Sequence, residues 1–206
     1  MITKTNYERE EAKIERHITA LYNAPLSPHY PYHNLAHTKM VVRYSQMIAT
    51  FYNLGRPENF TLTAAAWFHD IGQIFGSMLF HEEASVKMWN EFAEKTTISS
   101  AVRQQVSQCI LATKFPPSPS SLLEKIICDA DTFHFGTVYF RETDALVKKE
   151  LEIRTNEKVS DWIRKSIDLL QSHRFYTEYC QALLDNGKLN NIHWLQTLLK
   201  NEEPDS

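Results

Sequence analysis

The chain has 206 residues, of which 43% are hydrophobic and 12% aromatic, enough to form the buried core of one domain. Its formal net charge of −3 gives no basic surface of the kind that binds nucleic acid or an anionic membrane. Five glycines are too few for a glycine-rich phosphate loop or for the turn density of a β protein. We therefore expect a helical protein that binds neither nucleic acid nor a membrane.

The cysteines and the N-terminal segment bear on the cellular compartment. Cys109, Cys128 and Cys180 are odd in number and widely spaced, which indicates reduced thiols rather than disulfides or a CxxC metal site. The first 17 residues are polar and lack the apolar core of a signal peptide. No apolar run approaches the roughly 20 residues that cross a bilayer. These features predict a cytoplasmic protein.

Hydrophobic residues recur at helical spacing along almost the whole chain. The first expected helix buries one face and ends before three prolines; the face is Ile14, Ile18, Leu21 and Tyr22, and the prolines are Pro25, Pro28 and Pro31. The second begins at the N-cap Asn34, ends at Gly55-Arg56-Pro57, and carries a stripe of His37, Val41, Tyr44, Ile48 and Phe51.

The third expected helix starts at Thr61 or Thr63 and runs through AAAWFHD to a stop at Gly72. Further helices are expected over about residues 82–95, from Ser99 onward, and along a segment whose shared face is Leu123, Ile127, Ala130 and His134. The tract FPPSPSS (115–121) is a loop. The remaining helices lie at about 137–151, 159–185 and 190–200, with a break at Asn186-Gly187. No strand is expected, so the sequence predicts an all-α, single-domain helical bundle over residues 1–206.

Three features carry the candidate chemistry. The pair His69-Asp70 ends an apolar helix. Either the Asp70 carboxylate is buried, which is costly unless a cation pairs with it, or the pair forms a polar, solvated helix end. His37 lies in the apolar stripe of its helix, as a ligand or as a hydrogen-bonded core residue. Asp129 and Asp131 lie about 200° apart around their helix. Asp131 is nearer the apolar face and is the better ligand, whereas Asp129 is expected to support the site from behind or to face solvent.

Two imidazoles and two carboxylates from different helices suit a divalent cation such as Mn, Fe, Ni, Co, Zn or Mg. Such a cation, with coordination positions left open, lowers the pKa of water and polarises a phosphoryl oxygen, as phosphoester hydrolysis requires. His33, four residues before His37, is a candidate to support the site or to contact substrate.

Five blocks occur in order between about residues 30 and 140: YHNLAHT (32–38), AAWFHDIG (65–72), HEEAS (81–85), ILATKF (110–115) and DADTFHFG (129–136). In this order the sequence resembles the HD-domain superfamily of metal-dependent phosphohydrolases, and in particular its small stand-alone members. The resemblance implies an HD-type fold, with a core at about 30–140 and helices at about 141–200 packing on it. It assigns the metal ligands to His37, His69, Asp70 and Asp131.

The resemblance also bears on the catalytic residues. An ionisable residue three positions after the HD pair assists catalysis in several relatives, but Gln73 stands here and cannot take a proton. Asp70 is then the candidate to orient or deprotonate the attacking water. His81 and Glu82 are candidate proton donors or supporting groups, unless they serve only to start their helix.

Several further residues are candidates for contact with substrate. Thr113 and Lys114 could hold a phosphate, although a solvated lysine is the alternative, and His134 could face the site or merely pack. The leading hypothesis is a phosphohydrolase acting on a phosphoester or phosphoanhydride, with a nucleotide as the small-molecule partner.

Two alternatives remain open. The first is a nucleotide-sensing metal-binding module without turnover, which Gln73 favours. The second is a di-iron oxygenase, which requires additional histidines between the HD pair and the last aspartate, whereas only His81 lies there. The sequence does not predict the oligomeric state.

Overall fold

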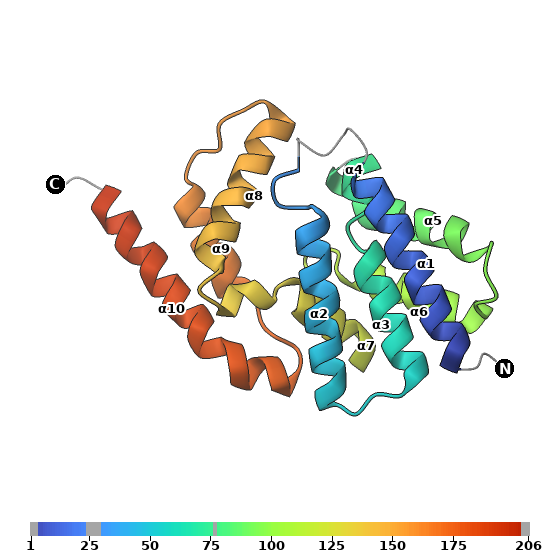
Figure 1. Cartoon of the computed structure of the whole chain (residues 1–206). Coiled ribbons are helices and arrows are strands. Elements are labelled where there is room, and N and C mark those ends of the chain that lie inside the picture. Colours follow the sequence, from blue (N-terminus) through green and yellow to red (C-terminus); the bar gives the residue numbers. More distant parts are fainter. Residues whose placement is uncertain (1–3, 24–29, 76–77, 203–206) are drawn as a thin grey trace. The chain divides into compact units, whose positions relative to one another are not determined.

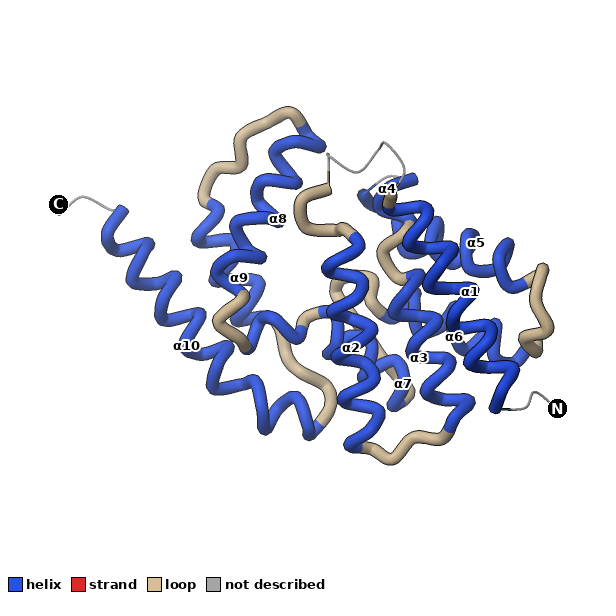
Figure 2. Tube along the Cα trace, in the orientation of Figure 1, coloured by secondary structure: helices blue, strands red, loops and turns tan. Residues whose placement is uncertain are grey.

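The computed structural model describes residues 4–23, 30–75 and 78–202, and every regular element within these ranges is a helix (Figures 1 and 2). This confirms the predicted all-α class. The chain divides into two compact units, residues 1–131 and 132–206. The expectation that the whole chain forms one domain stays a prediction.

The first unit is built around α3 (Arg56–Phe68), which contacts α1 (Lys4–Tyr22), α2 (Leu35–Phe51), α5 (His81–Ala93), α6 (Ser100–Ala112) and α7 (Leu122–Asp131). Every residue of α3 from Phe60 to Phe68 is buried. A helix that is apolar on all sides belongs at the centre of a bundle, and α3 lies between α1 and α2 in Figure 1. The short helices α4 (Gly72–Phe75) and η2 (Met78–Phe80) connect α3 to α5.

The boundaries of the first two helices follow the sequence closely. Helix α1 ends at Tyr22, with Ile14 and Ile18 fully buried as expected, while Pro25 and Pro28 fall outside the described residues. Asn34 caps α2, as predicted, because its side-chain oxygen accepts hydrogen bonds from the first-turn amides.

Four expectations for α2 and α3 are wrong. Phe51, expected in the buried stripe, is 55% exposed at the last residue of α2. The chain turns at Asn53, whose φ of 51° is left-handed, so Gly55-Arg56-Pro57 does not end α2 but begins α3. Proline suits a first helical turn because that turn leaves its amides unpaired in any case. The expected start at Thr61 or Thr63 is therefore late, and the expected stop at Gly72 is also wrong, because α3 ends at Phe68.

The second unit contains η3 (Phe133–Gly136), α8 (Phe140–Thr155), α9 (Trp162–Ser172) and α10 (Glu178–Glu202). The expected helix over 159–185 is interrupted at residues 173–177, where the chain leaves the helix and buries Phe175. Side chains of α10 bind the carbonyls exposed by this interruption: Gln181 donates to Phe175 O at 2.9 Å, and Lys188 donates to His173 O at 2.7 Å.

The expected break at Asn186-Gly187 does not occur, because α10 runs through it. A Cβ at Gly187 would collide with the carbonyl oxygen of Gly136, so the glycine serves close packing of η3 against α10. The predicted helix that shares the face of Ile127, Ala130 and His134 is also shorter than expected: α7 ends at Asp131, and His134 lies in η3.

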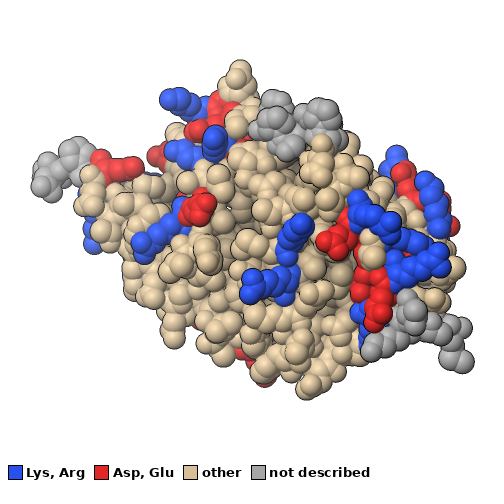
Figure 3. Space-filling view, in the orientation of Figure 1, with Lys and Arg blue, Asp and Glu red and all other residues tan. Residues whose placement is uncertain are grey.

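The surface agrees with the modest net charge. On the face drawn in Figure 3, Lys and Arg occur in small groups, several of them beside Asp and Glu, and form no continuous basic surface. Within the described ranges, no helix has both the length and the apolar character needed to cross a membrane. The expectation that nucleic acid is not a partner stays a prediction.

Candidate metal centre

The end of α3 presents the His69 side chain in one defined orientation. His69 follows the last residue of α3, and its backbone amide still donates to Ala65 O at 2.8 Å. Its Nδ1 lies 2.8 Å from Ala66 O, and because a carbonyl can only accept, Nδ1 carries the proton. In the neutral ring the Nε2 atom therefore keeps its lone pair for a cation, in a side chain that is fully buried.

Ser85 of α5 holds the turn that follows His69. Its hydroxyl donates to His69 O at 2.7 Å and accepts from the amide of Gly72 at 2.9 Å. Gly72 is needed because a Cβ there would collide with the carbonyl oxygen of His81. The HEEAS segment thus packs directly against the HD turn. The sequence offered Ser85 as part of this block, but its role was not predicted.

Four side chains converge from two helices, α2 and α7, and from the HD turn that follows α3. His37 comes from the first turn of α2, fixed by the Asn34 cap, whose Oδ1 accepts from the His37 amide at 3.2 Å. Asp131 is the last residue of α7. The donor atoms of His37, His69, Asp70 and Asp131 all lie within 4.8 Å of one another.

The individual separations are close to uniform. His69 Nε2 lies 3.1 Å from Asp70 Oδ2, 3.4 Å from Asp131 Oδ1 and 3.3 Å from His37 Nε2. His37 Nε2 lies 3.3 Å from Asp70 Oδ2 and 3.2 Å from Asp131 Oδ1. Ligands about 2.1 Å from a common ion, at angles of about 90–110°, are separated by about 3.0–3.4 Å. The five separations that involve an imidazole therefore match those expected around one divalent cation.

The electrostatics of the four groups point the same way. Burial acts to lower the pKa of His37, but hydrogen bonds to Asp131 and Asp70 outweigh it, and the pKa is raised. His69 is affected in the same sense, and its pKa lies well above the usual value against the opposing effect of burial. Burial acts to raise the pKa of Asp70 and of Asp131, but the imidazoles lower both. The two buried carboxylates thus require positive charge, which protons supply in the absence of a cation.

Of the four clustered side chains, that of Asp131 is the most exposed. Its side chain is 25% exposed, whereas those of His37, His69 and Asp70 are nearly or fully buried. Asp129, in contrast, is fully buried, so the expectation that it might face solvent is wrong. Helix α7 contacts α2, α3 and α6, so the side of α7 that carries Asp129 is covered as well as the side that carries Asp131.

Three further predicted residues surround Asp70. His33 Nε2 lies 3.8 Å from its Oδ2, and His81 Nε2 lies 3.5 Å from its Oδ1. His81 Nε2 also lies 3.2 Å from Glu82 Oε1, and Glu82 is buried. The structure thus brings His33 and His81 to the carboxylate of Asp70, with Glu82 beside His81.

The remaining candidates lie differently. The Thr113 hydroxyl donates to Ile110 O at 2.8 Å, and Lys114 forms an ion pair with Glu83, in which both side chains are about half exposed. Gln73 is buried beside the turn, and its backbone amide donates to Asp70 O at 2.9 Å. His134 belongs to the second unit. Substrate contacts for Thr113, Lys114 and His134 stay predictions.

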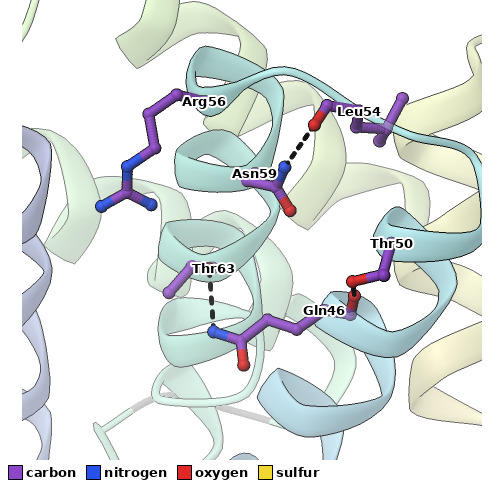
Figure 4. A pocket seen from close by; sticks show the side chains of 6 residues that line it. All are labelled: Gln46, Thr50, Leu54, Arg56, Asn59 and Thr63. Carbon is purple, nitrogen blue, oxygen red and sulfur yellow. Dashed lines mark hydrogen bonds between the residues drawn. The ribbon is translucent and has the colours of Figure 1, made fainter. Parts of the chain in front are cut away.

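A pocket of about 440 Å³ lies elsewhere on the first unit, near the C-terminal end of α2 and the start of α3 (Figure 4). Its lining residues are Gln46, Thr50, Leu54, Arg56, Asn59 and Thr63. Arg56 is paired with Glu11 through two bonds of 2.9 and 2.8 Å, which neutralises its charge. None of the predicted site residues lines this pocket.

The fold and the cluster place this protein in the class of helical proteins that hold a cation through four side chains, contributed by a His, a His-Asp pair and an Asp. The model of the HD domain matches residues 34–136, which is half of the chain, and the chain belongs to this family of metal-dependent phosphohydrolases. The match includes all four clustered residues.

One solved structure similar to this chain is a predicted HD superfamily hydrolase from an uncultured Thermotogales bacterium. The two share 19% sequence identity with a TM-score of 0.57, over 95% of this chain and 92% of the other. At this identity the similarity shows the fold. A search of the curated proteins finds no match.

Proposed function

We propose that this chain is a metal-dependent phosphohydrolase whose substrate is a nucleotide. The observation that carries the proposal is the cluster of four donor atoms, in which His37 Nε2 and His69 Nε2 lie 3.1–3.4 Å from each other and from both carboxylates, with the His69 ring oriented by the Ala66 carbonyl. Membership of the HD-domain family supports the reaction class. The donor set is suited to Mn, Fe, Ni, Co, Zn or Mg.

A divalent cation at this centre would supply two effects, a lower pKa of water and a polarised phosphoryl oxygen. The chain itself would handle the protons. Asp70 directs Oδ2 toward the other donor atoms and Oδ1 toward His81, so its carboxylate can orient the attacking water and accept its proton. His81, with Glu82 beside it, is the candidate to give a proton to the oxygen that leaves phosphorus.

A nucleotide sensor that binds without turnover is the second candidate. The observation that favours it is Gln73, a buried amide next to the turn, where an ionisable residue would give a second proton acceptor. In a sensor the same centre would hold the phosphate without cleaving it.

The proposal is tested by phosphate release from a panel of nucleotides, with metal content measured for every protein. Asp70→Asn should abolish hydrolysis more completely than it weakens substrate binding, because an amide neither ligates well nor accepts a proton. His81→Ala and Glu82→Ala should reduce turnover by about 10- to 1,000-fold, and Gln73→Ala should cost far less. Tight binding of one nucleotide by fully loaded wild-type protein, with no phosphate released from any, would replace the enzyme with the sensor.

A further inference from the structure

We propose that the exposed apolar segment Met78–Phe80, with Lys114 beside it, binds the base of the nucleotide while the phosphate occupies the cation centre. This inference rests on the proposed function and adds to it the residues that select the substrate. It assigns Phe80 as a stacking surface for a flat aromatic ring.

The exposure of this segment requires an explanation. None of the three residues of η2 is buried; Leu79 is 76% exposed and Phe80 is 60% exposed. Consecutive apolar side chains in water give up the free energy that burial would provide, so they commonly mark a place where something binds.

The segment is continuous with the candidate centre. Nδ1 of His81 lies 3.0 Å from Met78 O, and Nε2 of the same ring lies 3.5 Å from Asp70 Oδ1. A single imidazole ring thus separates the backbone of the segment from a carboxylate of the centre. The segment is therefore adjacent to the side of the centre on which His81 lies.

The charge near Phe80 favours an aromatic heterocycle as the occupant. Nζ of Lys114 lies 5.6 Å from the centroid of the Phe80 ring, and its ion pair with Glu83 joins the end of α6 to the start of α5. A base offers a π face for stacking and carbonyl or ring-nitrogen acceptors for an ammonium. A lipid chain would gain nothing from the ammonium, and a protein partner requires a contact area of about 800 Å² per side, far more than three side chains provide.

The test compares two ligands that share one phosphoester and differ in the base, adenosine 5′-monophosphate and ribose 5-phosphate. In metal-loaded full-length protein, Phe80→Ala should weaken binding of the nucleotide and lower its kcat/KM by about 10- to 100-fold, because stacking on an aromatic ring is lost. The corresponding values for ribose 5-phosphate should fall by no more than about threefold, and Phe80→Trp should retain the preference for the nucleotide.

Phe51→Ala is the matched control, because Phe51 is similarly exposed and lies on α2 about 21 Å along the helix from His37. It should change neither ligand. Equal losses for both ligands in Phe80→Ala, or no loss for either, would overturn the assignment. The nucleotide panel decides separately whether the protein is a phosphohydrolase, and if neither of these two ligands is hydrolysed, the ratio of their binding constants still decides whether Phe80 binds the base.

Discussion

Replacing Ser85 with alanine should destabilise the protein through the HD turn. Ser85 is fully buried, and its hydroxyl donates to His69 O and accepts from the Gly72 amide. The substitution leaves both backbone groups buried without this partner, at about 1–3 kcal/mol each, or about 2–6 kcal/mol of unfolding free energy in total. For a chain of this size the melting temperature should fall by at least about 4 °C.

The matched control is Ser45→Ala. Ser45 is also fully buried, but its hydroxyl donates to Val41 O, four residues earlier in the same helix. That carbonyl keeps its backbone hydrogen bond in α2, so the loss should be about 1 kcal/mol or less. Thermal melts of the two variants, followed by far-UV circular dichroism, measure the difference.

Metal affinity provides a second measurement on the same pair. Because Ser85 positions the turn that carries two donor atoms, Ser85→Ala should also weaken metal binding by about 10- to 100-fold. Ser45→Ala should leave metal affinity unchanged. Equal melting temperatures for the two variants, or an unaltered metal affinity in Ser85→Ala, would refute the role given to Ser85.

Three other outcomes are expected. Chelation should leave the helical circular dichroism largely intact, since a core of this size does not depend on one ion, while restoring the metal should raise the melting temperature; collapse to coil would contradict this. The pKa values of His37 and His69 are raised above 6.5, so at pH 6.5 both imidazoles are mostly protonated without a cation. Metal binding should then release more than one proton at pH 6.5 and progressively fewer as pH rises, so metal affinity should fall with falling pH. Calorimetry in buffers of different ionisation enthalpy measures this proton release, and finding none would contradict the prediction. Gly72→Ala should destabilise the fold far more than Gly55→Ala in parallel denaturant titrations, because the new Cβ meets the backbone of His81 in the first case and the flexible end of Glu58 in the second.

The sequence predicted the helical class and the four clustered residues because both depend on local chemistry. Asn34 could be recognised as a cap from its side chain alone, and His37 then falls on the inner face of α2 one turn later. Two anomalies are visible in the sequence without any tertiary structure: an imidazole on an apolar helix face, and an apolar helix that ends in His-Asp. The centre is where these anomalies meet.

The errors at helix ends have a different origin. Pro57 is compatible with ending one helix and with starting the next, so a proline alone could not decide which. From the sequence alone, Gly187 indicates a helix break. In the structure a glycine is required at this position because η3 packs against α10 at Gly136. The role of Ser85 was missed for the same reason, since its partners are backbone atoms 13 and 16 residues away.

The two aspartates of α7 show most clearly where the sequence argument stops. Helical geometry places Asp129 and Asp131 on different sides, and this correctly selected Asp131 for the centre. The same geometry does not tell how many neighbours a helix has. Helix α7 packs against α2, α3 and α6, so both sides are covered and both carboxylates are removed from bulk water to different degrees. A charge on the polar face of a helix can be taken as solvated only when the number of helices packed around it is known, and that number is a property of the whole bundle.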